Sequence, residues 1–446
     1  MAHIAIITSG SIGFLNASFE LMSRLQEEGH QLTCLSCLDV RSRVEEQGFP
    51  YMQLPEINFY PVLKGPDGKE AKGWKARFRL HLKRSKYLSE QGRELLGLDE
   101  FKSKLQQLHP DFALVNMELH EAIFTLMDLK IPFKLLSSWY NFYRIKGLPP
   151  IRRLIIPGQG FQGSAPGIAH GWAFVKAKIY GRYLFDMLQF RNYRRVLLKK
   201  YARQLGYPTA NLIHRNFPSI YIHKRLPILT MTLKELEFPH DSPDRFSYLG
   251  PMVFEKRQDK VSPETQEKLR HIFERKKASG SRLIYCSVSS NKRADADFLK
   301  NVIEAVRGVK SWLLVMTTGG KIPESFSKDL PDNVYVFNWL PQLQVLKEAD
   351  CSINHGGGHA ISECIHFSVP MLIFSGGEYD QNGCAARISY HGLGILGDTK
   401  QDDANAIQQK IEEILQNKKY QEKMEQMNLL YKQYRSRTLS PLILSE

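Results

Sequence analysis

The sequence lacks any run of about 18 apolar residues, the length that a membrane-spanning helix needs. Its apolar N-terminus has no basic leader and no apolar core of helical length, so it is interpreted as a first strand rather than a signal peptide. The sequence contains no low-complexity tract, internal repeat or known nucleic-acid-binding motif. We therefore expect a cytoplasmic protein that neither spans a membrane nor binds nucleic acid.

Cysteine is scarce and scattered, and its six residues are Cys34, Cys37, Cys286, Cys351, Cys364 and Cys384. Cys34 and Cys37 form one CxxC motif, but they lie in an apolar run that predicts a strand, and no second pair follows. This pattern favours buried, reduced thiols of a cytosolic enzyme over a redox or metal site. The sequence offers no other cluster of metal ligands, so neither a metal nor a bound cofactor is expected.

Acidic residues are outnumbered, with 46 Asp and Glu against 61 Lys and Arg, and the net charge is +15 at pH 7. Such an excess favours an anionic partner. Because nucleic-acid motifs are missing, the remaining candidates are an anionic membrane surface and phosphorylated small molecules. The 446 residues suffice for two domains, each with its own core.

Short apolar runs alternate with amphipathic stretches, which is typical of parallel βαβ units. The first series has a predicted helix at Ala17–Glu28 and predicted strands at Ile4–Thr8, Leu32–Leu38, Asp111–Asn116, Phe133–Ser137, Ser219–His223, Ile228–Thr232 and Tyr248–Leu249. Residues 139–215 break the alternation with mixed aromatic and basic residues. The second series has predicted strands at Arg282–Ser287, Trp312–Thr317, Val334–Phe337, Cys351–Asn354 and Met371–Phe374, then helices at Asp402–Gln416 and Tyr420–Tyr434.

The polar stretch 255–264 separates the two series and is interpreted as a linker. The predicted fold class is therefore α/β, with two tandem Rossmann-like domains at 1–254 and 265–446. Ligands of such domains bind at the carboxyl ends of the parallel strands, so a cleft is expected where the two domains face each other.

A glycine-rich segment, Asn354-His355-Gly356-Gly357-Gly358-His359, follows a predicted strand and precedes a predicted helix. Glycines let the backbone approach a ligand closely, and a helix N-terminus offers unpaired N–H groups to an anion. The two histidines add side-chain donors. This segment predicts a diphosphate site, although a tight turn that needs glycine for packing alone would look the same.

Three further motifs favour the diphosphate site over a turn that needs glycine for packing alone. The segments Trp339-Leu340-Pro341-Gln342, His355-Gly356-Gly357, Glu363 and Asp380-Gln381 resemble the signature of the family 1 nucleotide-sugar glycosyltransferases. These include the UDP-glycosyltransferases and the bacterial macrolide and glycolipid glycosyltransferases. The resemblance implies a GT-B fold with an N-terminal acceptor domain, a C-terminal donor domain and a last helix that returns to the N-terminal domain.

The resemblance also implies a set of donor-binding residues: Trp339, Gln342, His355, Gly356, Gly357, Gly358, His359, Glu363, Asp380, Gln381 and Ser290. Trp339 would stack on uracil or thymine, and Gln342 would bond the base or ribose. His355 and the glycine N–H groups would hold the diphosphate, and Glu363 the ribose hydroxyls. Asp380 and Gln381 would hold the sugar. Three positions depart from the family pattern: His359-Ala360 replace Asn-Ser, Ser289 replaces Gly, and Cys384 replaces Asn.

The acceptor half of the resemblance is incomplete. The family's general base is a His in a Gly-His-x-x-Pro context after the first strand, but this chain reads Gly13-Phe14-Leu15-Asn16-Ala17, so an acceptor-binding Phe14 stands in its place. Phenylalanine cannot accept a proton. Glu118 and His120 follow a predicted strand and are candidates for a relocated base, although both also suit a solvated helix start. Alternatively, the acceptor is already ionised, the protein only binds the donor, or the loop is offset in the comparison.

Two basic and aromatic segments lie in the N-terminal half. Residues 72–86 read KGWKARFRLHLKRSK, with seven Lys or Arg, and residues 175–200 have a similar mixture. A basic helix with an apolar face suits an anionic bilayer, although it also suits an ordinary solvated face. We expect a metal-independent, inverting transferase that moves a hexose from a UDP- or dTDP-sugar to a lipophilic acceptor, peripheral on the inner face of a membrane. The alternative is a catalytically weak auxiliary protein that kept the donor pocket.

Overall fold

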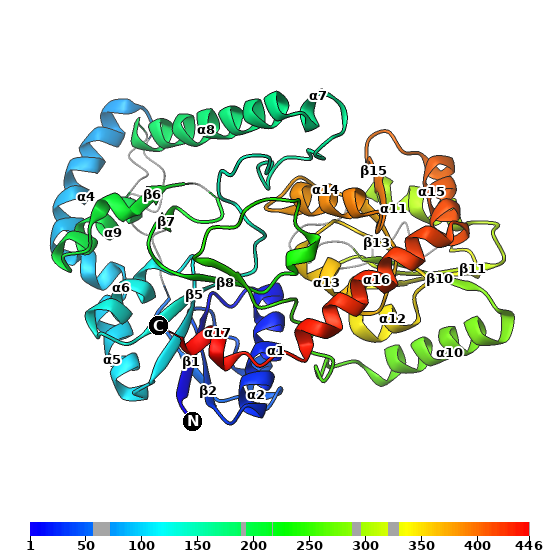
Figure 1. Ribbon diagram of the computed structural model, residues 1–446, viewed down its shortest axis with the longest axis horizontal. Helices are drawn as coiled ribbons and strands as arrows, with labels where there is room; N and C mark the ends of the chain where they lie inside the picture. Colours follow the sequence, from blue (N-terminus) through cyan, green and yellow to red (C-terminus); the bar gives the residue numbers. More distant parts are fainter. Residues whose placement is uncertain (57–71, 189–192, 216, 288–295, 320–329, 446) are drawn as a thin grey trace.

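The computed structural model describes residues 1–56, 72–188, 193–215, 217–287, 296–319 and 330–445. They form two α/β units that lie side by side (Figure 1). Each unit is a parallel sheet whose strands are short, buried apolar runs, as expected where helices cover both faces. The predicted fold class is confirmed.

The N-terminal sheet has the order β3-β2-β1-β4-β5-β8-β9, and each neighbouring pair is parallel. Its strands are β1 (His3–Thr8), β2 (Gln31–Ser36), β3 (Tyr51–Gln53), β4 (Phe112–Asn116), β5 (Phe133–Ser137), β8 (Ile228–Thr230) and β9 (Phe246–Tyr248). A separate antiparallel pair is formed by β6 (Leu212–His214) and β7 (Tyr221–His223). The helices are α1 (Ile12–Glu27), α2 (Arg41–Glu45), α4 (Trp74–Leu95), α5 (Leu98–Leu108), α6 (His120–Asp128), α7 (Gly160–Gly163), α8 (Ala165–Leu188) and α9 (Tyr193–Gln204).

The C-terminal sheet has the order β12-β11-β10-β13-β14-β15 and is also parallel. Its strands are β10 (Arg282–Ser287), β11 (Trp312–Thr317), β12 (Val334–Phe337), β13 (Cys351–Asn354), β14 (Met371–Phe374) and β15 (Gly394–Gly397). The helices are α10 (Pro263–Ser279), α11 (Ala296–Val306), α12 (Gln342–Glu348), α13 (Gly358–His366), α14 (Gln381–His391), α15 (Ala404–Gln416), α16 (Lys418–Arg435) and α17 (Ser440–Leu444). The polar stretch 255–264 leads into α10, whose N-cap Ser262 accepts a hydrogen bond from the Thr265 N–H.

Helix α1 begins at Ile12, five residues before the predicted start at Ala17. The prediction placed a glycine-bearing turn there, but Phe14 and Leu15 are buried and their apolar contacts extend the helix toward β1. Gly13 and Phe14 therefore belong to the first turn of a helix rather than to a loop. The irregular-looking stretch 139–215 also differs, because it contains the helices α8 and α9.

The C-terminal segment crosses back onto the N-terminal domain, where α17 lies beside α1 (Figure 1). The Arg24 guanidinium donates to the carbonyl oxygens of Tyr434 and Arg437, at 3.0 and 2.7 Å. The Glu28 carboxylate accepts from the backbone N–H groups of Leu439 and Ser440, at 2.7 and 2.8 Å. Such charge-assisted bonds to helix ends hold the segment in one position.

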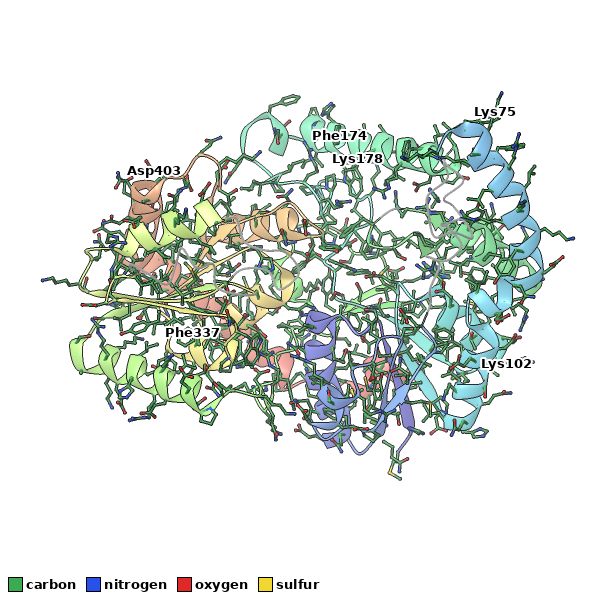
Figure 2. All side chains as sticks on the ribbon, turned by 180° about the vertical axis from the view of Figure 1, so that it is seen from behind. Lys75, Lys102, Phe174, Lys178, Phe337 and Asp403 are labelled. Carbon is green, nitrogen blue, oxygen red and sulfur yellow. The ribbon has the colours of Figure 1, made fainter. Side chains whose placement is uncertain are left out.

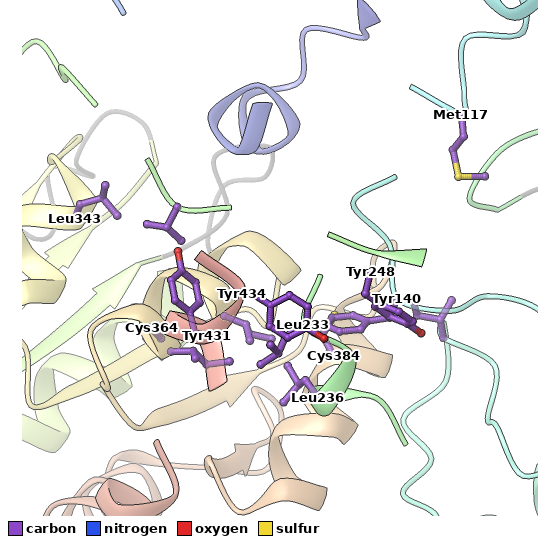
Figure 3. Close-up of a cluster of buried hydrophobic side chains, with 14 of the residues drawn as sticks. Met117, Tyr140, Leu233, Leu236, Tyr248, Leu343, Cys364, Cys384, Tyr431 and Tyr434 are labelled. Carbon is purple, nitrogen blue, oxygen red and sulfur yellow. The ribbon is translucent and has the colours of Figure 1, made fainter. Parts of the chain in front are cut away.

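A buried ion pair joins the two domains beside α14. The Arg387 guanidinium is fully buried and donates through Nε to Glu237 Oε2 at 3.0 Å. The rings of Tyr140 and Phe238 lie 4.8 and 4.7 Å from the guanidinium carbon. Figure 3 shows Tyr140 and Tyr248 of one domain packed close to Cys384 of the other. Because breaking a buried pair leaves an uncompensated charge, this contact fixes how the two domains face each other.

Candidate functional site

A cavity of about 770 Å³ lies between the domains, at the carboxyl ends of both sets of strands. The N-terminal wall comes from the segments after β1, β4 and β5, and includes Phe14, Glu118 and Trp139. The C-terminal wall comes from the segments after β12, β13 and β14. Its volume falls in the range that small-molecule sites occupy. The cavity therefore sits where parallel sheets bind their ligands, and we call it the cleft.

The turn from β13 into α13 faces the cleft and is shaped for an anion. Gly356 has a φ of +80°, and a Cβ there would lie 2.9 Å from Ile373 Cγ2, so glycine is required. Helix α13 begins at Gly358, whose N–H donates to the Asp380 carboxylate, and its N-cap residue Gly357 has no side chain. The positive end of the helix dipole and the other N–H groups of the first turn are available to a negative ligand.

His355 adds an unused polar atom to the same turn. Its Nδ1 is buried and has no hydrogen-bond partner within the described part of the chain. Burial lowers the pKa of this imidazole, so it is neutral at pH 7 and carries one N–H that can donate. A buried polar group without a partner is costly, which indicates that a ligand supplies the missing bond.

The far end of the cleft holds Trp339, whose side chain is 49% exposed and therefore available for stacking. Beside it, Gln342 donates to Glu363, and Arg257 Nη1 lies 3.1 Å from the second carboxylate oxygen of Glu363. Burial raises the pKa of Glu363, and Arg257 opposes that rise. Glu363 is therefore held at the cleft by two partners from different segments.

Asp380 stands at the N-cap position of α14, yet its side chain makes no capping bond. Its carboxylate is buried and accepts from the Cys384 thiol at 3.2 Å. Burial raises the pKa of Asp380 to about 6. Gln381 lies next to it, and its Oε1 accepts from the Glu378 N–H at 3.3 Å. The same carboxylate accepts from the backbone N–H of Gly358, so it lines the cleft where the starts of α13 and α14 meet.

His359 reaches across the cleft to the N-terminal domain. A Cβ built on Gly13 would lie 2.8 Å from His359 Cδ2, so the imidazole rests directly against the first turn of α1. Burial lowers the pKa of His359 to about 4. The imidazole is thus neutral at physiological pH and occupies the space beside the family's base position.

Phe14 lines the cleft but is only 5% exposed, because its ring also packs in the N-terminal core. The neighbouring Asn116 donates to Ser9 Oγ at 3.3 Å. The position where the resemblance implies a base therefore holds an apolar ring, and its polar neighbour is an amide. Neither side chain can take a proton from an acceptor.

The two candidates for a relocated base lie in different places, one at the cleft and one in the core. Glu118 lines the cleft and accepts from Trp139 Nε1 at 3.1 Å, and burial raises the pKa of its carboxyl. His120 is fully buried and bonds His223 at 3.1 Å and Ser219 at 2.8 Å. The prediction that His120 is a base is therefore wrong, because α6 begins at this residue and turns its side chain into the core.

Comparison with known proteins gives one family. A model described as the erythromycin biosynthesis protein CIII-like C-terminal domain matches residues 304–430. The NDP-glycosyltransferase YjiC of Bacillus subtilis is 22% identical over 414 residues, which span 92% of this chain and 88% of that relative. The uncharacterized UDP-glucosyltransferase YdhE of Bacillus subtilis is 28% identical over 194 residues, which span 43% of this chain and 46% of that relative.

Solved structures agree on the fold. The kitacinnamycin glycosyltransferase aligns with a TM-score of 0.69 at 19% identity, over 98% of this chain and 97% of its own. The calicheamicin glycosyltransferase CalG4 aligns with a TM-score of 0.61 at 17% identity, over 98% and 95%. At these identities the structural likeness shows the GT-B fold alone. The sequence matches above support a glycosyltransferase. Together these matches support a glycosyltransferase of the family 1 type.

Two residues of the cleft were missed by sequence reasoning. Arg257 and Asp259 lie in the predicted linker, line the cleft and bond each other at 3.0 Å. The only available signal was a pair of opposite charges two residues apart in a hinge segment. Ser290, which the resemblance assigns to donor binding, lies outside the described residues.

The described residues of this glycosyltransferase contain no group of three or more side chains suited to a metal ion. The six cysteines are buried and unpaired, and burial raises the pKa of both Cys34 and Cys37 to about 12. Thiols held so strongly in their protonated form are poor nucleophiles and poor ligands, so the CxxC motif has a packing role.

Proposed function

We propose that the protein transfers a hexose from a UDP- or dTDP-sugar to a hydroxyl of a lipophilic acceptor, with inversion and without a metal ion. The observation that carries this proposal is the unpartnered, buried Nδ1 of His355 beside the N-terminus of α13. An imidazole N–H and the positive end of a helix at one point both favour a diphosphate. The names of two relatives, an NDP-glycosyltransferase and a UDP-glucosyltransferase, support the donor class.

The donor lies along the C-terminal wall of the cleft in this proposal. The base stacks on Trp339, the ribose hydroxyls donate to Glu363, and the diphosphate accepts from His355 and the α13 N–H groups. Those donors also stabilise the departing diphosphate, since negative charge grows there as the glycosidic bond breaks. Asp380 and Gln381 are left beside the sugar, at the end of the cleft that faces the acceptor domain.

Glu118 is the base in this proposal. Its carboxylate lines the cleft on the acceptor side, and Trp139 holds it in one orientation. Because burial raises its pKa, it is a stronger base than an ordinary carboxylate. It takes the proton from the acceptor hydroxyl while the oxygen attacks the anomeric carbon. His359 is the other titratable group near Gly13, but a pKa of about 4 makes it a weaker base.

A second candidate function is favoured by Phe14, which stands where the resemblance implies the base. In that case the protein is a catalytically weak auxiliary that binds nucleotide sugars. The two functions are separated by measuring UDP-glucose and dTDP-glucose binding alongside nucleoside diphosphate release with a panel of phenolic and aliphatic alcohols. Transfer predicts release with at least one acceptor. Tight donor binding without release, even by hydrolysis, supports the auxiliary function instead.

We also propose that the enzyme meets its acceptor at the inner face of an anionic membrane. Helices α4 and α8 lie on the same side of the molecule (Figure 1). They expose large apolar side chains among lysines and arginines: Trp74, Phe78, Leu82, Tyr87, Phe174, Tyr180, Leu184, Phe185 and Leu188. No helix of the described residues could itself cross a bilayer. Flotation with phosphatidylglycerol vesicles at physiological salt, and not with phosphatidylcholine vesicles, is expected. Absence from both floated fractions contradicts it.

A further inference from the structure

A second cavity, of about 680 Å³, lies beside the cleft and under α8. Its walls come from the first half of the chain, at residues 142–153, 172–195 and 215–220, and from Gly377 and Asn382 of the donor domain. Phe174 and Lys178 on α8 are two of its lining residues and are labelled in Figure 2. We call it the cationic pocket.

The charges of the cationic pocket are unbalanced. Seven arginine or lysine residues line it, against one carboxylate, Asp186. Two of the cations have a carboxylate partner: Arg194 bonds Glu121 at 2.7 Å, and Arg182 lies 4.0 Å from Asp186. For Arg152, Arg153, Lys178 and Arg215, the described part of the chain provides no ion pair. A surplus of cations in a concave site attracts an anion.

The unbalanced charge is held in place by aromatic rings. The Arg152 guanidinium lies 5.2 Å from the Phe217 ring centre, and Arg153 lies 4.9 Å from that of Phe174. Stacking keeps a guanidinium ordered while its N–H edges stay free for an oxyanion. Burial, Arg195 and Arg215 lower the pKa of the adjacent His214 to about 4, as expected in a positive field.

The same pocket has an apolar side. Trp172 and Ile151 are buried in its wall, and Phe142, Ile179 and Ile220 also line it. An inorganic anion would use the arginines and leave these surfaces empty. A molecule with an apolar body and one oxyanion uses both kinds of wall, which is the usual composition of a small-molecule site.

The cationic pocket adjoins the cleft through one pair of rings. Phe217 lines the pocket, and its ring centre lies 4.9 Å from that of Trp139, which lines the cleft and donates to Glu118. On the opposite side, Gly377 lines the pocket and its neighbour Glu378 lines the cleft. The rings of Phe217 and Trp139 thus lie between the pocket and the proposed base.

We propose that the cationic pocket is the acceptor subsite and that the acceptor is an amphiphilic anion. Its carboxylate or phosphate is bound by Arg152, Arg153, Lys178 and Arg215, and its apolar body lies along Trp172. Its hydroxyl extends past Phe217 and Trp139 to Glu118. This inference rests on the proposed transferase function, because it assigns the acceptor of that reaction.

The test compares three naphthalenes of one shape in direct binding, followed by quenching of tryptophan fluorescence without any donor. These are 2-naphthol, 6-hydroxy-2-naphthoate and 2-naphthyl phosphate. The naphthoate or the phosphate is expected to bind at least about tenfold more tightly than 2-naphthol, and the tighter of the two identifies the oxyanion. Equal affinities for all three, or no binding of either anion, overturn the inference.

A double variant tests whether the preference for anions comes from the cationic pocket. The double substitution Lys178→Met with Arg153→Gln is expected to remove about tenfold of the anion's affinity and to leave 2-naphthol unchanged. The matched control is Lys176→Met, on the same helix and exposed but outside the pocket. An unchanged anion affinity in the double variant overturns the inference, as does an equal loss in the control.

Nucleoside diphosphate release, measured with UDP-glucose and each hydroxynaphthalene, keeps the two proposals apart. Anion-selective binding without nucleoside diphosphate release supports the cationic pocket as a binding site and counts against the transferase function. If release below saturation is as fast with 2-naphthol as with the naphthoate, the transferase function is supported and the pocket assignment is overturned.

Discussion

The two walls of the cleft differ in how they are built. On the donor wall, the groups proposed to meet the diphosphate are the backbone of one turn and one adjacent histidine, contributed by a short contiguous segment. On the acceptor wall, Phe14, Glu118 and Trp139 come from three separate segments. The donor wall departs from the family pattern at three positions but keeps its glycines and His355, whereas the acceptor wall lacks the expected base.

The sharpest way to break this comparison is to remove the proposed base. We expect Glu118→Gln to lower kcat by about 10²–10⁴-fold while leaving donor affinity unchanged, because the amide keeps the Trp139 contact but cannot accept a proton. Glu121→Gln is no control, since Glu121 pairs with Arg194 in the core. His359→Gln is the comparison variant, because it removes the other titratable group near Gly13 and should lower kcat far less than Glu118→Gln does.

The pH profile adds a second readout for Glu118. Burial raises its pKa, so it acts as a base only above that raised value, and activity should fall as pH is lowered through it. The acid limb of kcat/KM should therefore lie above the ordinary value for a glutamate. If this limb persists unchanged in Glu118→Gln, another group controls it and Glu118 is not the base.

On the donor wall, His355→Ala should weaken UDP binding by about tenfold to a hundredfold, since it deletes a hydrogen bond to a charged group. Calorimetric titration with UDP measures the loss directly. His109→Ala, at the end of α5 and far from the cleft lining, is the matched substitution and should bind UDP normally. Equal affinity in both variants would mean that the unpartnered Nδ1 does not meet the diphosphate.

Asp380 allows a comparison of stability with function in the free protein. Its folded pKa of about 6 exceeds the ordinary 3.8, so the folded state holds the proton more tightly than the unfolded state does. Stability contributed by this group is therefore present below about pH 4 and is lost as pH rises through about 6. Asp380→Asn should raise the free energy of unfolding by about 2–3 kcal/mol at pH 8 and have little effect at pH 4. Denaturant titrations at both values measure it, and a gain of equal size at pH 4 would contradict the assignment.

The smallest effect is expected where the walls touch. Gly13→Ala places a methyl 2.8 Å from the His359 ring, which must turn away, so donor KM should rise about threefold with the fold intact. Ser11→Ala, an exposed neighbour, should leave the KM unchanged. A Gly13→Ala variant with normal KM would show that the position of His359 does not matter for the donor.

The fold and the donor wall could be predicted because both depend on local patterns. Buried apolar runs specify parallel strands, and the glycine turn with its histidines is contiguous in the sequence. The start of α1 was missed because Gly13 suggested a turn, whereas burial of Phe14 and Leu15 favours a helix. His120 was misjudged because spacing alone does not say which face of a helix meets the core.

The remaining groups could not be predicted because folding alone brings them together. Arg257 reaches Glu363 across 106 residues. Arg152 and Arg215 line one pocket only because α8 and the segment around Phe217 close over the same space. In the sequence both arginines lie in the stretch 139–215, outside the two basic segments, and nothing there distinguishes a cavity wall from a solvated surface.

The central claim is that the donor wall works with a relocated base, so that this chain is an inverting transferase despite Phe14. The most direct test follows UDP-glucose with 6-hydroxy-2-naphthoate or 2-naphthol by proton NMR, for the wild-type protein and for Glu118→Gln. The account predicts a β-glucoside, recognised by the large coupling of its anomeric proton, which forms in the wild type and almost disappears in the variant. An α-glucoside, or equal rates in the two proteins, would contradict it.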